Sequence, residues 1–267
     1  GTPEPQEVTL ADLTIPEGYT LEQIAQTVGQ LQGDFKEPLT AEAFLAKAQD
    51  ETFIAQEVAK YPNLLESLPA KDSGVRYRLE GYLFPATYAI KESTTIESLI
   101  DSMLAAMDKN LSPHYAAIKE KNLTVNELLT IASLVEKEGA KTEDRKLIAG
   151  IFYNRLNQNM PLQSNIAILY AEGKLGQNIS LADDAAIDTS IDSPYNVYTK
   201  VGLMPGPVDS PSLDAIESSI NQTKSDYLYF VANVQDGKVY YATTREEHDR
   251  NVQEHINSKL HQSNSTN

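Results

Sequence analysis

The sequence predicts an α+β protein in which a small β-α-α-β module precedes a larger mixed domain that ends in a β-hairpin and a helix. Capping boxes at Thr20 with Gln23 and at Thr124 with Glu127 mark the starts of two helices. The segment DYLYFVANVQDGKVYYAT alternates apolar and polar residues around an Asp-Gly turn, which is typical of a hairpin. With 267 residues, the chain is long enough for one large domain or two smaller ones.

The first module is predicted over residues 13–90, after a flexible lead-in at residues 1–12. Apolar residues recur on one face of the helix after Thr20, and apolar and polar residues alternate in Arg78–Ile90 as they do in strands. The elements expected in order are a strand at Leu13–Ile15, a helix from Thr20, a helix from Thr40, and a strand within Arg78–Ile90. This order resembles a LysM-like sugar-binding module, and a small packing domain without a ligand is the alternative.

The second domain is predicted over residues 91–260, followed by a disordered tail at residues 261–267. The segment IDSPYNVYTKVGLMPGPVDSPS is rich in Pro, Gly and Ser, so an ordered loop is expected there. Helices are expected over residues 94–121, 124–139, 143–157 and 166–171, and from Thr244 to about Leu260.

Composition narrows the possible partners. Lys and Arg number 22 against 38 Asp and Glu, a net charge of −16, which argues against nucleic acid and anionic membranes as ligands. The chain has no Cys, so disulfides, thiolate catalysis and zinc–cysteine sites are excluded. Trp is absent and Tyr numbers 14, so tyrosine would have to stack on any bound sugar. No apolar run approaches the roughly 18 residues that span a bilayer.

The stretch LLTIASLVEKEGA carries two glutamates in the last turn of an apolar helix. At 100° per residue, Glu136 falls on the face of Leu129 and Ala132, whereas Glu138 falls toward the other side. Burial and the negative end of the helix dipole would both raise the pKa of Glu136, as a general acid requires. The alternative is that Glu136 turns outward or pairs with Lys137 or an arginine.

Other catalytic patterns are missing. The four histidines are scattered without HExxH spacing and are expected at the surface, so no metal or cofactor is predicted. Nucleotide-binding glycine loops and a GxSxG elbow are absent. A group of aspartates lacks the spacing of a calcium loop and is expected to be solvated; it comprises Asp183, Asp184, Asp188 and Asp192.

Neutral polar residues near these helices suit a glycan-binding site, although each one alone is typical of a cap, a turn or the core. Amides and tyrosine rings can hydrogen-bond and stack on sugars without adding charge. The predicted substrate-binding residues are Asn154, Gln163, Asn165, Tyr195 and Asn196.

Five ordered blocks together resemble the YceG-like (MltG) endolytic murein transglycosylase family. They are LEGYLFPATY, LLTIASLVEKEG, IAGIFYNRLNQNMPLQSNIAILYAEGKLG, DSPYNVYTKVGLMPGPVDSPSLDAIE and DYLYFVANVQDGKVYYATTREEHDRNV, within residues 79–255. The TIPEGYTLEQIAQ segment fits the LysM-like part of the same family. Two blocks depart from the family pattern: Ala86 stands where members often have Asp, and Ser164-Asn165-Ile166 replaces Thr-Asp-Pro.

The resemblance implies a peptidoglycan lytic transglycosylase. It implies internal cleavage between N-acetylmuramic acid and N-acetylglucosamine, 1,6-anhydro-muramic ends, and Glu136, the first glutamate of the V-E-K-E block, as the catalytic residue. It also implies a single N-terminal membrane anchor, a position on the outer face of the cytoplasmic membrane, and cell-wall synthesis proteins such as penicillin-binding proteins as partners.

The sequence leaves three alternatives to a lytic transglycosylase. They are a non-catalytic wall-binding module, a muramidase-type hydrolase and a scaffold for cell-wall synthases. A hydrolase would place a second carboxylate opposite Glu136, and the nearest candidates lie in Asp183–Asp192.

Overall fold

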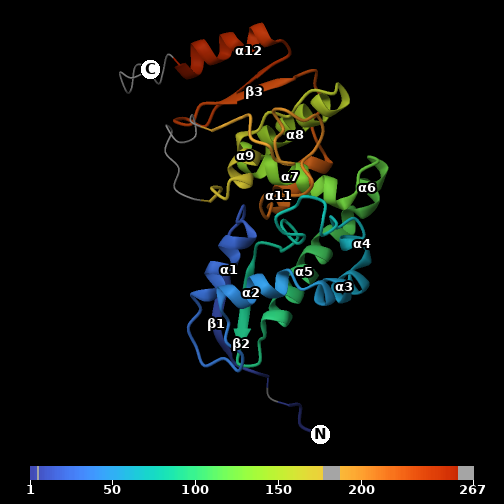
Figure 1. Ribbon diagram of the computed structural model, residues 1–267, viewed down its shortest axis with the longest axis vertical. Helices are drawn as coiled ribbons and strands as arrows, with labels where there is room; N and C mark the ends of the chain where they lie inside the picture. The colour runs from blue at the N-terminus through green and yellow to red at the C-terminus, as the bar shows by residue number, and fades with distance from the viewer. Residues whose placement is uncertain (5, 177–186, 258–267) are drawn as a thin grey trace.

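The computed structural model describes residues 1–4, 6–176 and 187–257, and it shows a mixed α+β protein with two short antiparallel sheets. Figure 1 places the N-terminal sheet and its helices toward one end of the molecule, and the hairpin with α12 toward the other. Helices α7, α8 and α11 lie between the two ends. Within the described residues, no helix is long and apolar enough to cross a membrane.

The N-terminal half holds one sheet and four intervening helices. Strands β1 and β2 pair antiparallel, with Thr14 opposite Thr87. The bounds are β1 (Thr9–Thr14), α1 (Leu21–Gly29), α2 (Ala41–Ala48), α3 (Glu51–Lys60), α4 (Pro62–Leu65) and β2 (Thr87–Lys91).

Two expectations for this half need correction. Four helices, not two, separate the strands, because Asp50 caps α3 through the N–H groups of Thr52 and Phe53, and Pro62 starts α4. Strand β1 begins at Thr9, inside the expected lead-in, because pairing with β2 orders a stretch that carries no strong strand signal of its own. The capping box of α1 at Thr20 is confirmed.

The second half is mainly helical. The helix expected over residues 94–121 is broken into α5, η1 and α6, with Pro113 in the first turn of η1. The predicted helices α7, α8 and α9 and the predicted hairpin are confirmed. The bounds are α5 (Ile96–Leu111), η1 (Ser112–His114), α6 (Tyr115–Glu120), α7 (Val125–Glu138), α8 (Thr142–Asn157), α9 (Asn165–Ala171), α11 (Leu213–Ile220), β3 (Tyr229–Ala232) and β4 (Val239–Ala242).

The C-terminal helix differs from its prediction. Helix α12 (Arg245–Asn251) begins after the predicted cap Thr244 but gives way to a π-helical turn, η2 (Val252–Asn257). The rest of the expected helix, to Leu260, and the tail lie outside the described residues.

Helix α7 joins the two apolar clusters of the protein. Leu128, Leu129 and Ala132 belong to a cluster that continues through α5 and α1 to the β1–β2 sheet. Ile131, Leu134 and Val135 of the same helix belong to a cluster shared with α8, α9 and α11. The first cluster crosses residue 90 without a break, and the division of the chain near that residue stays a prediction.

Backbone pairing also ties the two halves together. The Gly18 N–H donates to the Ser210 carbonyl at 2.7 Å, and the Ser210 N–H donates to the Tyr19 carbonyl at 2.8 Å. Gly18 has φ +80°, and a side chain there would meet Lys137 Nζ at 3.2 Å. The turn after β1 therefore lies directly against the last turn of α7.

Glu80 is a buried acid whose titration should weaken the fold as the pH rises. Its side chain accepts a hydrogen bond from the Leu21 N–H at 2.7 Å and the residue is 2% exposed. Burial raises its pKa from 4.5 to about 7, although the Leu21 N–H and Arg76 act in the opposite direction. Between these pH values the folded protein keeps a proton that the unfolded chain releases, so stability falls as the pH rises through that window.

We therefore expect Glu80→Gln to unfold at a higher urea concentration than the unsubstituted protein at pH 8. Its free energy of unfolding should be larger by up to about 3 kcal/mol at that pH, and this difference should shrink toward pH 4.5. Glutamine keeps an acceptor for the Leu21 N–H but carries no proton-linked charge. The matched control is Glu120→Gln on the exposed end of α6, which should leave the pH profile unchanged. Parallel profiles for Glu80→Gln and the unsubstituted protein would contradict this expectation.

Candidate active site

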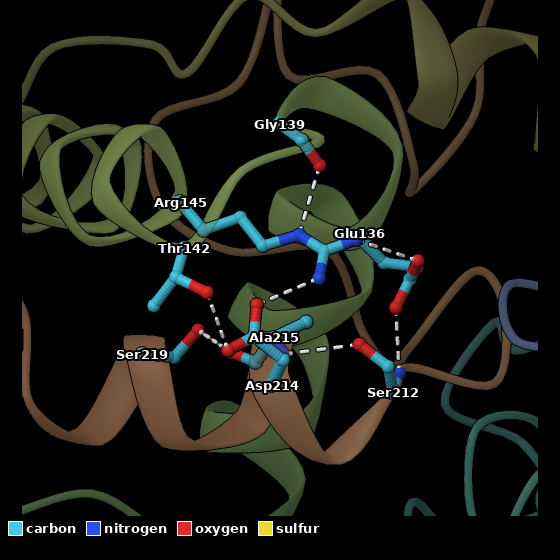
Figure 2. Close-up of polar contacts among 8 residues, drawn as sticks. All are labelled: Glu136, Gly139, Thr142, Arg145, Ser212, Asp214, Ala215 and Ser219. Carbon is cyan, nitrogen blue, oxygen red and sulfur yellow. Dashed lines mark hydrogen bonds and ion pairs between the residues drawn. The ribbon is translucent and has the colours of Figure 1, made fainter.

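The two glutamates at the end of α7 have different surroundings. The Glu136 side chain is 8% exposed, and its Oε1 accepts a hydrogen bond from the Ser212 N–H at 2.6 Å. Its Oε2 accepts from Arg145 Nη2 at 3.2 Å, while Arg145 Nη1 donates to Asp214 at 2.8 Å (Figure 2). Both carboxylate oxygens of Glu136 therefore have partners inside the protein.

This arrangement matches the alternative in which Glu136 pairs with an arginine. Glu136 lies on a buried face, as the helical periodicity predicted, and the Arg145 guanidinium and the Ser212 N–H both donate hydrogen bonds to its side chain. The partners Arg145 and Ser212 come from α8 and the turn before α11, so Glu136 joins three elements. Glu136 is not among the residues that line the cavity beside it in the sequence, at Glu138.

Glu138 instead lines a cavity of about 540 Å³. Ser164 Oγ and Glu138 Oε1 lie 3.0 Å apart, with the hydroxyl as donor. The walls come from α7, α8, the segment before α9, the first turn of α9, the loop that follows residue 187, β3 and α12. Within the described chain, Glu138 is the acidic member of a lining that otherwise comprises Phe152, Arg155, Leu162, Gln163, Ser164, Asn165, Ile166, Tyr198, Tyr229, Phe230, Val231, Ala232, Val234, Arg245 and His248.

Two predicted substrate-binding residues line this cavity with Glu138. Gln163 has a φ of +57°, uncommon for a residue other than glycine, and its N–H donates to the Val197 carbonyl at 3.1 Å. The backbone thus holds Gln163 in an unusual conformation at the pocket wall. Asn165 Oδ1 accepts a hydrogen bond from the Tyr198 hydroxyl, which also lines the pocket.

Three other predicted residues are absent from the pocket lining and bond to backbone groups of loops. Tyr195 is 2% exposed, and its hydroxyl accepts from the Arg76 N–H. Asn196 is fully buried, donates to the Thr189 and Ile191 carbonyls, and accepts from the Tyr198 N–H. Asn154 donates to the Ser225 and Tyr227 carbonyls. The structure therefore gives Tyr195, Asn196 and Asn154 roles in holding loops, and none of them is in the pocket lining.

Sequence reasoning missed several groups. Tyr198 follows Tyr195 by three residues in the same block, which was an available signal. His248, expected at the surface, is half-buried and stacks on Tyr229 with ring centroids 5.2 Å apart. Asp209 is fully buried, and neither of its carboxyl oxygens has a hydrogen-bond partner among the described residues; burial raises its pKa well above the usual value.

The aspartates considered for a second catalytic carboxylate do not join the pocket. Asp188 accepts hydrogen bonds from Ser190 and is not in the lining, and neither is Asp192. Asp183 and Asp184 lie outside the described residues. In the part of the chain that the structure describes, no three His, Cys, Asp or Glu side chains converge as metal ligands would.

The fold and the pocket together define a class: mixed α+β proteins in which a helix ends in a pocket-facing carboxylate beside amides, tyrosines and arginines, groups that suit a glycan. Comparison with known proteins gives the family. The model of the YceG-like family matches residues 3–254, and the chain belongs to that family.

Similar proteins agree with this placement. A Streptococcus pneumoniae serotype 2 (strain D39) protein named endolytic murein transglycosylase is 86% identical over 97% of this chain. A Bacillus subtilis (strain 168) protein of the same name is 35% identical over 92% of the chain and 66% of its own length. A crystal structure of a YceG-like protein from Listeria monocytogenes superposes with a TM-score of 0.78 at 36% identity, covering 91% of this chain and 76% of that one. The chain spans 47% of the pneumococcal relative.

Proposed function

We propose that this pocket cleaves peptidoglycan glycan strands internally, between N-acetylmuramic acid and N-acetylglucosamine, and leaves 1,6-anhydro-muramic ends. The relatives' name, endolytic murein transglycosylase, supports this activity. The observation that carries the proposal is Glu138, the acidic group of the pocket lining within the described residues, held by Ser164 beside Gln163, Asn165 and Tyr198.

We assign the acid–base role to Glu138 in place of Glu136. A proton donor must come within about 2.6–3.2 Å of the oxygen that it protonates. Glu136 would have to give up Ser212 and Arg145 to do so, whereas Glu138 already lines the space that a sugar would occupy.

One carboxyl is enough for this reaction. Glu138 gives its proton to the glycosidic oxygen as the bond from C1 to that oxygen breaks. The carboxylate then takes the proton of the muramic acid C6 hydroxyl as its oxygen bonds to C1, so no water is consumed. Hydrolytic glycosidases, in contrast, use a second carboxylate about 5–9.5 Å away to bond the sugar or activate water.

The neutral groups of the pocket would hold the sugar during these steps. Asn165 and the Tyr198 hydroxyl form one hydrogen-bonded pair, and Gln163, two residues before Asn165, lines the same pocket. Amides and a hydroxyl can bind the N-acetyl group and ring hydroxyls, and they stabilise partial charge without competing with Glu138 for the proton.

The experiment that tests this function is digestion of purified glycan strands followed by mass analysis of the new ends. The expected muramic end is about 18 Da, one water, lighter than a hydrolytic end, because the C6 oxygen replaces solvent at C1. Reducing muramic ends would make the protein a muramidase-type hydrolase, and intact strands would leave it a binding module.

Other features of the full-length protein are proposed on the resemblance alone. Residues 13–90 would form a LysM-like module that contacts glycan, ahead of a catalytic domain over residues 91–260. An N-terminal anchor would hold the protein at the outer face of the cytoplasmic membrane, next to cell-wall synthesis proteins such as penicillin-binding proteins.

A further inference from the structure

One wall of the pocket is cationic. Arg155 on α8 and Arg245 on α12 line the same cavity as Glu138, with His248 next to them. The whole chain has a net charge of −16, so the two arginines and one carboxylate among the described lining residues are the reverse of its average composition. Such a local concentration of positive charge indicates an anionic ligand.

Arg155 is fixed in place but not neutralised. It is 6% exposed, Nε donates to the Leu228 carbonyl, and Nη1 donates to the Pro161 carbonyl, each at 2.7 Å. Its guanidinium also lies 5.0 Å from the centre of the Tyr229 ring. It makes no ion pair, and its Nη2 makes no hydrogen bond, with any residue that the structure describes.

A buried cation normally has an anionic partner, because removing its charge from water is costly. Two carbonyl oxygens and an aromatic face compensate only part of that cost. Arg155 therefore presents a pre-positioned positive charge at the wall of a cavity large enough for a ligand.

Arg245 and His248 extend this wall. Arg245 pairs with Asp249 through Nε at 3.0 Å, and neither of its terminal nitrogens bonds to a described residue. The His248 ring stacks on Tyr229, and its Nδ1 is buried with no hydrogen-bond partner in the part of the chain that the structure describes. Burial, reinforced by Arg245 and Arg155, lowers the pKa of His248, so the positive charge comes from the two arginines.

We propose that Arg155 and Arg245 bind a carboxylate of the stem peptide carried by the muramic acid of the strand being cleaved. This inference rests on the proposed function, since it places the peptide in the same pocket as Glu138. In a peptide-bearing strand the carboxyl of muramic acid is taken up by the amide bond to the peptide. The sugars then offer neutral hydroxyl and N-acetyl groups, and the free carboxylates are those of the peptide. A guanidinium fork matches the two oxygens of a carboxylate, so the wall would select strands that still bear their peptides.

The test compares three forms of the same purified strands: peptide-bearing with free carboxylates, peptide-bearing with amidated carboxylates, and stripped of peptide with the exposed muramic carboxyl amidated. We expect kcat/KM for the free-carboxylate form to exceed that of both others by about tenfold, the size of one hydrogen bond between charged groups. The preference should decrease at high salt, because the contact is between charges.

A single substitution tests whether the arginines of this wall cause the preference for free carboxylates. Replacing Arg155 would also release the Leu228 and Pro161 carbonyls, so the exposed Arg245 is the safer substitution. Arg245→Gln should reduce the preference about threefold, in keeping with a solvent-exposed charge. Arg250→Gln on the same helix, which is exposed and outside the pocket lining, is the matched control and should keep the full preference.

The outcomes separate this inference from the proposed function. Equal rates on the three forms, or faster cleavage of stripped strands, would overturn the carboxylate site and leave the function in place. An unchanged preference in Arg245→Gln would also overturn it. If no form is cleaved, the proposed function itself fails.

Discussion

Glu138→Gln is expected to lower the rate of glycan cleavage by about 10²–10⁴-fold, the usual contribution of a general acid–base group. Glutamine keeps the shape of the side chain and can still bond Ser164, but it can neither give nor take the proton. The melting temperature and the binding of strands should change little. The measurement is the rate of release of muramic ends from purified strands.

Glu136→Gln is the matched control for this result. It changes a carboxyl two residues away on the same helix, but one with internal partners and outside the pocket. We expect a lower melting temperature and measurable cleavage at temperatures well below it. The opposite outcome, an active Glu138→Gln and an inactive but folded Glu136→Gln, would return the catalytic role to Glu136.

Arg145→Met is expected to lower the free energy of unfolding by about 3–5 kcal/mol, because it leaves the carboxylate of Glu136 buried without its cation. Arg145 also donates from Nε to the Gly139 carbonyl at the end of α7, and the substitution removes that bond as well. Its side chain is 11% exposed, so solvent screens the pair only weakly.

The double variant Arg145→Met with Glu136→Gln separates the effect of the unpaired Glu136 charge on stability from the other effects of losing Arg145. Neutralising Glu136 removes the unpaired anion, so the double variant should recover part of the stability that Arg145→Met loses. Urea unfolding of the four proteins gives the coupling energy. A loss below about 1 kcal/mol in Arg145→Met, the range of a surface ion pair, would show that Glu136 and Arg145 do not form a buried pair.

Much of the fold could be predicted from local sequence. The boxes at Thr20 and Thr124 placed the starts of α1 and α7 because capping depends on residues three apart. The hairpin followed from alternation around Asp236-Gly237 in the same way. Strand β1 was missed over Thr9–Asp12, because its order comes from β2, more than 70 residues away.

The candidate active site was also predicted only as far as local sequence allowed. The helical wheel predicted correctly that Glu136 is buried and that Glu138 faces the other way. It did not predict what each face meets, since Arg145 reaches Glu136 from α8 and the walls around Glu138 come from α9, β3 and α12. A carboxylate on an apolar face is as consistent with a buried ion pair as with catalysis, and only the packing distinguishes the two.

The glycosidic bond that is cleaved should lie next to Glu138. A crystal structure of Glu138→Gln with a bound, uncleaved glycan strand tests this most directly. The account predicts that the glycosidic oxygen between muramic acid and N-acetylglucosamine lies within about 3.2 Å of the side chain at position 138. It also predicts that Asn165 or Tyr198 contacts the N-acetyl group. A strand bound elsewhere, or a glycosidic oxygen next to Glu136 with Arg145 and Ser212 displaced, would contradict it.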